Sequence, residues 1–272
     1  MHWGPPKVNQ ILRAKSLLGR EIFRLRNRIL RDRRFLCSIE KAKGNEASSL
    51  INSLYRLHNN YKSYLEIGVE YGFTFEAVQI PKKMGVDPYP KFNTWLKPRN
   101  TKIYSITSDR FFGMHKRQLF DLVYLDGLHT FEQTYKDLRN ASRMMTDKGL
   151  LLIDDTVPCD EFSALPDQQE SYKRRELAGG VNTGSWHGDV FKLLWILSEY
   201  YSEELDWYTL MDLQNPKTLV LKKSKKSYSS IFEKPVDTNR ASTKSFLETF
   251  NGMQEEVIRP IQTISLLKHL EA

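Results

Sequence analysis

The stretch that most constrains the fold is residues 120–156, in which two short apolar runs each end on acidic residues. The first run ends on Asp126 and the second on Asp154 and Asp155. Short apolar runs bounded by glycine and aspartate are typical of fully buried strands in a parallel sheet. Between them, residues 131–145 carry apolar side chains at helical spacing. The stretch therefore predicts a strand, a helix and a second strand parallel to the first.

Both acid-bearing strand ends should meet at the carboxyl edge of the sheet, where open α/β sheets bind their ligands. Three carboxylates placed together repel one another unless a positive charge lies among them, so a divalent cation is the simplest explanation. The alternative is structural: Asp126 caps the helix that follows it, and Asp154 and Asp155 begin a loop.

Length and composition favour one cytoplasmic α/β domain. A chain of 272 residues with 40% hydrophobic residues can bury a full core. No stretch approaches the roughly 18 uninterrupted apolar residues of a membrane span, and the N-terminus lacks the apolar core of a secretory signal. The two cysteines, Cys37 and Cys159, do not suggest a disulfide framework, and we expect Cys159 to be an ordinary buried or loop cysteine.

The net charge of +8 is concentrated at the N-terminus. Residues 1–43 hold 12 Lys and Arg against 3 Asp and Glu, whereas the rest of the chain holds 29 against 30. Leu18, Ile22, Leu25 and Ile29 recur at the spacing of an amphipathic helix. Such a helix could pack on the rest of the chain or on a second copy, or lie on an anionic membrane surface. Nucleic acid is the weakest of these partners, because no RNA-recognition motif or aromatic interleaving accompanies the basic residues.

A glycine-punctuated turn follows another short apolar run, residues 64–67, and opens a helix. Gly68 and Gly72 let the backbone turn tightly and approach a ligand. A second short strand ends on Asp87, about twenty residues later, where an acid can hydrogen-bond the two hydroxyls of a ribose. A third strand is expected over residues 102–106, followed by small polar residues at a helix start.

Four motifs, taken in order, resemble those of class I S-adenosylmethionine-dependent methyltransferases. They are Leu-Glu-Ile-Gly-x-x-x-Gly at 65–72, Gly-Val-Asp-Pro at 85–88, Asp-Leu-Val-Tyr-Leu-Asp-Gly-Leu-His at 121–129 and Leu-Leu-Ile-Asp-Asp at 151–155. Within that class the chain is similar to the branch typed by Asp-Gly-x-His-x-(Tyr/Phe)-Glu and a later Gly-Asp-Val-(Trp/Phe)-Lys, here residues 188–192. The spacing of the acids is also similar to that of metal-dependent catechol and sugar O-methyltransferases. The resemblance covers about residues 60–222.

The resemblance implies a role for each matching residue. Glu66, Gly68 and Gly72 would form the turn beside the methionine part of S-adenosylmethionine, with Thr74 near its carboxylate. Asp87 would bind the ribose. The remaining cofactor-binding residues would be Ser108 and Asp109, by the adenine, and Asp126. The metal ligands would be Asp126, Asp154 and Asp155, holding Mg²⁺ or another divalent cation.

Two histidines are catalytic candidates. His129 stands where the catechol enzymes place a catalytic lysine, and an imidazole there could take the proton of the acceptor. The alternative is that a neighbouring carbonyl satisfies His129 at a helix start. His187 is the second candidate; its alternative is a residue that begins a helix, with Asp189 capping the helix that runs through Leu194 and Ile196.

The predicted fold is a Rossmann-like α/β domain with a seven-stranded, mostly parallel sheet, a closing antiparallel hairpin and helices on both faces. We divide the chain into a basic helical extension (1–60), the methyltransferase domain (61–222) and a helical tail (223–272). The long polar stretch 158–186 is expected to be a lid or substrate loop, or else an unordered surface loop. Its basic residues could meet an anionic acceptor; they are Lys173, Arg174 and Arg175.

The expected activity is divalent-metal-dependent O-methylation of a small hydroxylated acceptor by S-adenosylmethionine. A sugar or glycoside is the first choice of acceptor and a catechol-like phenol the second. A nucleic-acid methyltransferase that uses the basic N-terminal arm and a non-catalytic scaffold that kept the fold are the alternatives. A homo-oligomer and peripheral membrane contact through the N-terminal helix are left open.

Overall fold

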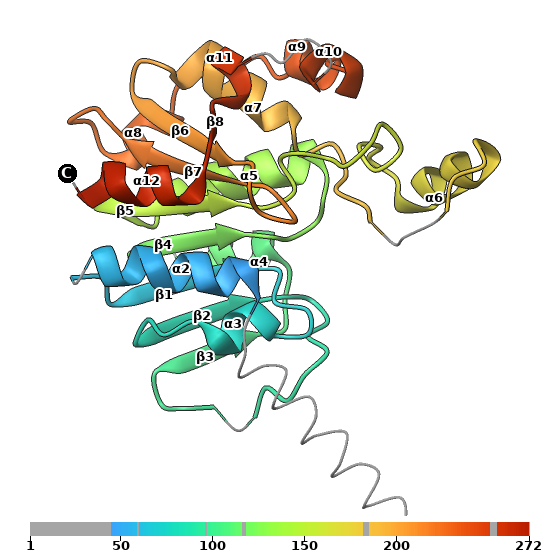
Figure 1. Cartoon of the computed structure of the whole chain (residues 1–272). Coiled ribbons are helices and arrows are strands. Elements are labelled where there is room, and N and C mark those ends of the chain that lie inside the picture. Colours follow the sequence, from blue (N-terminus) through green and yellow to red (C-terminus); the bar gives the residue numbers. More distant parts are fainter. Residues whose placement is uncertain are drawn as a thin grey trace, which may run out of the picture.

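The computed structural model describes residues 45–58, 60–95, 97–115, 118–181, 185–250 and 255–271. These residues form one mixed sheet with helices packed on both of its faces (Figure 1). The basic helix predicted within residues 1–43, and Cys37, lie outside the described residues.

The sheet has eight strands: β1 to β7 form the predicted seven-stranded sheet, and β8 is an additional strand. The strands are β1 Ser63–Ile67, β2 Lys82–Val86, β3 Thr101–Tyr104, β4 Phe120–Leu125, β5 Met145–Ile153, β6 Leu205–Leu210, β7 Lys217–Lys222 and β8 Pro260–Ile261. Their order is β3-β2-β1-β4-β5-β7-β6-β8. Strands β1 to β5 pair in parallel, whereas β7 is antiparallel to both β5 and β6, which confirms the closing hairpin. The parallel pair β4–β5 confirms the central strand–helix–strand unit.

Two buried clusters separate the faces of the sheet. One cluster is covered by α4 (Ser108–Met114), α5 (Phe131–Ser142), α7 (Lys192–Ile196), the π-helix η1 (Leu197–Tyr201), α8 (Tyr228–Phe232), α9 (Asn239–Ser242) and α11 (Glu255–Ile258). The other is covered by α2 (Glu46–Leu57), α3 (Phe73–Ala77) and α12 (Thr263–Glu271). Helix α2 lies within the stretch 1–60 that was predicted to be helical, and the prediction of helices on both faces of the sheet is confirmed.

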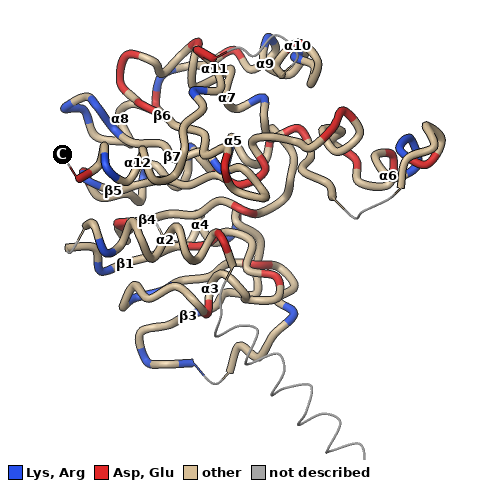
Figure 2. The backbone as a smooth tube through the Cα atoms, viewed as in Figure 1, with Lys and Arg blue, Asp and Glu red and all other residues tan. Residues whose placement is uncertain are grey.

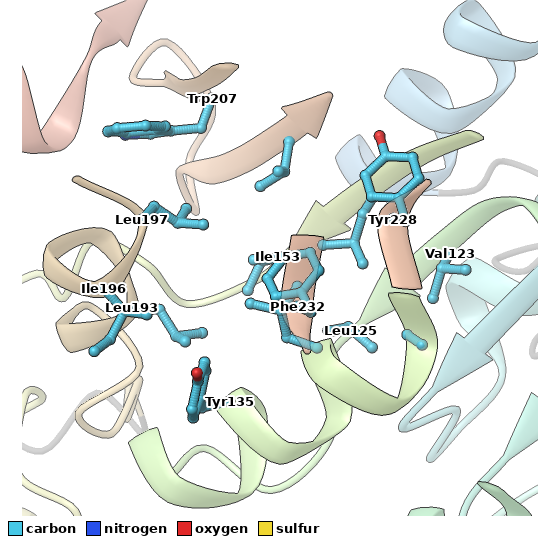
Figure 3. Close-up of a cluster of buried hydrophobic side chains, with 14 of the residues drawn as sticks. Val123, Leu125, Tyr135, Ile153, Leu193, Ile196, Leu197, Trp207, Tyr228 and Phe232 are labelled. Atoms are coloured by element: carbon cyan, nitrogen blue, oxygen red, sulfur yellow. The ribbon is translucent and has the colours of Figure 1, made fainter. Parts of the chain in front are cut away.

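The strand sequence decides which side chain enters which cluster. On β4, Val123 and Leu125 join the α5 side, shown in Figure 3, while Leu122 and Tyr124 join the α2 side. This alternation is the two-residue period of a strand, and because both faces are covered the whole run is apolar. Each fully buried aliphatic side chain of this kind stabilises the fold by about 1.5–3 kcal/mol. The central strands are thus held rigidly, and the residues that follow them are placed accurately.

The stretch 158–186 contains a helix that the sequence pattern did not predict. Helix α6 (Gln168–Leu177) lies apart from the sheet, at the right of Figure 1. Asp167 caps it by accepting from the backbone N–H of Glu170 at 2.7 Å. Arg175 is buried and pairs with Asp160 at 2.8 Å, so this side chain ties α6 to the loop before it. Arg175 is therefore not free to meet an anionic acceptor.

The C-terminal tail packs on the domain. Helix α8 lies against α5 and β5, and α12 lies against α2. Strand β8 extends the sheet beside β6; its two residues, one of them proline, carry no alternation that a sequence pattern could show. The boundary at residues 222 and 223 stays a prediction. Of the helices that the structure describes, none is long and apolar enough to cross a membrane.

Candidate active site

Two pockets lie at the carboxyl edge of the sheet. The larger, of about 770 Å³, is lined by His129 and by seven of the eight predicted cofactor residues: Glu66, Gly68, Thr74, Asp87, Ser108, Asp109 and Asp126. The smaller, of about 490 Å³, is lined by Asp154, Asp155 and His187 among others. Asp126 and Trp186 line both pockets, so the two spaces share a wall. In Figure 2, acidic positions lie at the ends of β4 and β5, whereas basic ones gather at the opposite edge near α8.

The turn after β1 depends on glycine. Gly68 has a φ of +87°, and a Cβ built on it would lie 1.7 Å from the carbonyl oxygen of Asp126. The backbone N–H of Asp126 donates to the carbonyl of Ile67 at 2.8 Å, which holds the two strand ends together. Gly72 does not line the pocket; it is the residue before α3, with a φ of +76°. Both glycines are needed for the backbone conformation, as predicted.

Glu66 is buried at the end of β1 beneath the larger pocket. Tyr64 Oη donates to Glu66 Oε2 at 2.6 Å. Burial raises the pKa of Glu66 to about 8, although the hydrogen bond from Tyr64 and the charge of Lys83 act in the opposite direction. At neutral pH most molecules therefore carry a proton on Glu66.

Cofactor binding is expected to release this proton. The amino group of S-adenosylmethionine is cationic, and a positive charge beside Glu66 lowers its pKa and favours the carboxylate. Near pH 7 each binding event should release up to about one proton, and affinity should rise with pH towards 8. Calorimetric titration in two buffers of different ionisation enthalpy measures this release. Glu66→Gln should abolish it; equal release from that variant would contradict the assignment.

Asp87 is held in place by backbone donors at the end of β2. The N–H of Glu70 donates to Asp87 Oδ2 at 2.9 Å, and that of Tyr89 to Oδ1 at 2.7 Å. These bonds orient the carboxylate at the wall of the larger pocket, where the ribose hydroxyls are expected.

Asp87→Ala is expected to weaken binding of S-adenosylmethionine by about 10–100-fold, the cost of losing hydrogen bonds to a charged acceptor. Asp87→Asn keeps the shape and one acceptor oxygen, so its loss should be smaller. Affinities from calorimetry, with unfolding curves to confirm that both variants fold, check the prediction. An unchanged affinity for Asp87→Ala would place the ribose elsewhere.

A polar group that the sequence analysis missed lines the far end of the same pocket. Gln133 Nε2 donates to Ser108 Oγ at 3.2 Å, to Asp109 Oδ1 at 3.3 Å and to Asp137 Oδ1 at 3.0 Å. Lys136 pairs with Asp109 at 2.6 Å. Side chains of α5, which begins just after the Asp-Gly-Leu-His motif, thus orient Asp109. The sequence signal for this polar group is limited to the four-residue spacing of Gln133 and Asp137, which places them on one face of the helix.

His129 lies between two carboxylates in the larger pocket, beside the wall that the two pockets share. Its Nδ1 is 2.9 Å from Asp155 Oδ2 and 3.2 Å from the carbonyl oxygen of Trp186, and its Nε2 is 3.7 Å from Asp126 Oδ1. The ring stacks on Trp186 with centroids 5.1 Å apart. Burial alone would lower the pKa of His129. The hydrogen bond to Asp155 and the negative charges of Asp155 and Asp126 outweigh burial and raise the pKa to about 10. The ring is therefore an imidazolium at neutral pH.

The Gly-Asp-Val-Phe-Lys motif holds the His129 turn. Asp189 Oδ1 accepts from the backbone N–H of Phe131 at 2.7 Å, and Lys192 pairs with Asp189 at 2.8 Å. Gly188 has a φ of +63°, and a Cβ on it would lie 1.5 Å from the carbonyl oxygen of His129. Asp189 therefore caps α5 rather than the helix of its own segment, which corrects our expectation. The Asp-Gly-Leu-His and Gly-Asp-Val-Phe-Lys motifs, which define the predicted branch, therefore contact each other.

Asp154 is saturated with hydrogen-bond donors. Its Oδ1 accepts from Lys217 Nζ at 2.8 Å, Asn215 Nδ2 at 3.0 Å and the backbone N–H of Asp155 at 2.9 Å, and its Oδ2 accepts from Tyr124 Oη. Burial and the charge of Asp155 raise the pKa of Asp154, whereas Lys217 opposes the rise. The sequence analysis missed Lys217, Asn215 and Tyr124, because only the antiparallel register of β7 brings the first two to this edge.

The predicted set of three carboxylate ligands does not fit this arrangement. The donors that come together among the described residues are Asp126, His129 and Asp155, whose ligand atoms all lie within 4.8 Å of one another. Asp154 is not among them, and its oxygens already accept four hydrogen bonds. In Asp155, burial favours the protonated form, but the hydrogen bond and charge of His129 prevail and lower the pKa. An Asp–His–Asp set could hold a cation only after His129 gives up its bond to Asp155.

His187 lines the smaller pocket and is buried. Its backbone N–H donates to the carbonyl of Ser163 at 3.0 Å, while its Nδ1 has no hydrogen-bond partner among the described residues. Burial lowers its pKa, so this ring is neutral at neutral pH. Cys159, an exposed loop residue, lies at the wall of the same pocket.

Comparison with known proteins finds a matching family for the middle of the chain. Residues 65–156 match a family model described as a methyltransferase domain. No curated protein matches the chain. The match contains the glycine turn, Asp87 and both acid-bearing strand ends, so the part of the chain that carries the predicted motifs is similar to methyltransferase domains.

Three solved structures illustrate the similarity. The sugar N-methyltransferase KedS8 from Streptoalloteichus sp ATCC 53650 is 18% identical, with 40% of this chain and 47% of that chain covered and a TM-score of 0.33. The SAH-bound methyltransferase PaMTH1 of Podospora anserina is 16% identical (66% and 78% covered, TM-score 0.45). The O-methyltransferase TomG from Streptomyces achromogenes, involved in tomaymycin synthesis and in complex with SAM, is 12% identical (66% and 80% covered, TM-score 0.39). The chain spans about half the length of KedS8, and similarities this low carry nothing over to the acceptor of this chain.

Proposed function

We propose that the protein transfers the methyl group of S-adenosylmethionine to a hydroxyl of a small acceptor, with a sugar or glycoside as the first choice. The cofactor occupies the larger pocket and the acceptor the smaller one. The observation that carries this proposal is the shared wall: Asp126 and Trp186 line both pockets, and His129 lies against both of these residues. Donor and acceptor can therefore approach each other beside an ionisable group.

The sulfonium of S-adenosylmethionine supplies an activated methyl group, so the protein has to bind, orient and manage one proton. Asp155 and the carbonyl of Trp186 hold Nδ1 of His129, so Nε2 is the ring atom that takes up the proton of the acceptor once the imidazolium has lost its own proton there. A cationic cofactor in the adjoining pocket favours the neutral ring over the imidazolium. His187, neutral and on the other side of the smaller pocket, is the second candidate for this proton.

The lining of the smaller pocket supports a polyhydroxylated acceptor. Most of its side chains are polar or charged, including those of Asp155, His187, Asn215 and Lys217. Hydroxyls of a sugar can exchange hydrogen bonds with the polar groups that face this pocket, whereas a catechol-like ring would leave more of them without partners. The face of Trp186 offers one apolar wall, which suits either ring. A phenol is therefore the second choice.

No divalent cation takes part in this proposal, because Asp154 is saturated and Asp155 is paired with His129. Cation-dependent transfer at Asp126, Asp154 and Asp155 is the alternative. A second copy of the chain, or a membrane surface bound by the N-terminal segment, also stays a prediction, since residues 1–44 are outside the described part.

The test is transfer of labelled methyl groups from S-adenosylmethionine to a panel of methyl glycosides, catechols and RNA. We expect labelled ether products from at least one glycoside, formed by the wild-type chain and not by Asp87→Ala at the same cofactor concentration. Transfer only to phenols would replace the first choice by the second. Transfer to RNA with steep salt dependence would contradict the proposal.

A further inference from the structure

Lys217 is a buried lysine inside the acidic cluster, and the cofactor pocket does not account for it. It is the first residue of β7, only 3% exposed. Because β7 runs antiparallel to β5, with Thr218 opposite Ile153, its first residue lies at the carboxyl end of β5. Lys217 Nζ lies 2.8 Å from Asp154 Oδ1 and also donates to the carbonyl of Asn215 at 3.0 Å.

The polar side chains around Lys217 are hydrogen-bonded to one another. Asn215 Nδ2 bridges Asp154 Oδ1 and Asp155 Oδ1 at 3.0 Å each, and Tyr124 donates to the remaining oxygen of Asp154. The ion pair Lys217–Asp154 is almost completely removed from solvent, with side-chain exposures of 4% and 8%. A buried pair that is hydrogen-bonded on both sides is costly to break, because either partner alone would be left as an unpaired charge.

Cationic side chains offset most of the carboxylate charge of the cluster without a metal ion. Lys217 faces Asp154, and His129 lies between Asp126 and Asp155, so two cationic side chains face three carboxylates. A divalent cation on Asp154 would lie in contact with the ammonium group, and like charges at contact distance repel strongly where water is excluded. The cation would also have to displace donors from both Asp154 oxygens.

We propose that the ammonium group of Lys217 is the resident cation of this cluster, that it excludes a divalent cation from Asp154, and that, with His129 bonded to Asp155, methyl transfer needs no metal. The part of this inference that concerns transfer rests on the proposed function. The part that concerns metal binding does not, since it is measured without cofactor or acceptor.

The test is titration of the full chain with Mn²⁺, followed by electron paramagnetic resonance of the free ion. The wild-type chain is expected to bind no Mn²⁺ at millimolar concentration. Lys217→Met removes the charge at similar length and should create one site per chain. Lys217→Gln can still donate to Asp154 and so protects the fold, and it should gain the same site. Lys217→Arg keeps the charge and should stay without one.

Lys222→Met is the matched control, because this lysine lies on the same strand but pairs with the exposed Asp147 at 3.1 Å, away from the site. It should bind no Mn²⁺. Saturable binding of one Mn²⁺ by the wild-type chain, lost in Asp155→Ala, would overturn the proposal, and so would a folded Lys217→Gln variant that binds none. In the transfer assay, full wild-type activity in excess chelator is expected, and loss of activity that Mg²⁺ restores would overturn the metal-free claim.

Discussion

Replacement of His129 by alanine is expected to slow methyl transfer by roughly 10²–10⁴-fold, the usual range for loss of a general base. His129 lines the larger pocket beside Asp126 and Trp186, which line both pockets, and Asp155 and the carbonyl of Trp186 fix its ring. The affinity for S-adenosylmethionine should stay nearly unchanged, because Asp87 and the glycine turn lie on other strands. Single-turnover rates and calorimetric affinities separate the two effects.

His269→Ala is the control, since this histidine is exposed on α12 and packs edge-on against Tyr208. It should change neither quantity. A His129→Ala variant with a rate within threefold of wild type, roughly 0.7 kcal/mol, would remove His129 from proton transfer. In that case the same loss in His187→Ala would move the role to the second candidate.

Gly68→Ala is expected to abolish cofactor binding and to destabilise the fold. An alanine at a φ of +87° costs about 1–2 kcal/mol for the left-handed conformation alone. The added Cβ would also lie 1.7 Å from the carbonyl oxygen of Asp126, which is backbone and cannot turn aside. The end of β1 must therefore separate from the end of β4, and this movement opens the floor of the larger pocket. Denaturant unfolding and calorimetry measure the two losses.

Gly179→Ala is the matched control, because Gly179 has a similar φ of +79° and nothing within 4 Å of its added Cβ. Gly179→Ala should lower the free energy of unfolding by only about 1–2 kcal/mol, the cost of the left-handed backbone conformation, and should keep cofactor binding. If both variants bound S-adenosylmethionine equally well, the close approach of Gly68 to Asp126 would not matter for the pocket.

The sequence predicted those parts of the site whose position depends on one local segment of the chain. Gly68, Asp87 and Asp126 each follow a buried strand, and parallel strands bring such residues to one edge whatever the rest of the chain does. The apolar runs of β4 and β5 identified the two central strands, and the other segments were placed relative to them. His129, a catalytic candidate from the resemblance, also lines the larger pocket.

The parts that the sequence did not predict depend on register and on long-range contacts. Lys217 reaches Asp154 only because β7 is antiparallel to β5, and an isolated lysine before a strand gives no sign of that pairing. Asp189 caps a helix that begins 58 residues earlier in the chain. The metal was inferred from three acids alone and stays a prediction; Lys217, which pairs with one of these acids, comes from another segment.

The central claim, that the larger pocket binds S-adenosylmethionine, is tested most directly by calorimetric titration of the purified chain with this cofactor. We expect saturable binding at one site per chain, weakened in Asp87→Ala and absent in Gly68→Ala. Binding should persist in His129→Ala and in excess chelator. No measurable binding at millimolar cofactor to the folded wild-type chain would contradict the account.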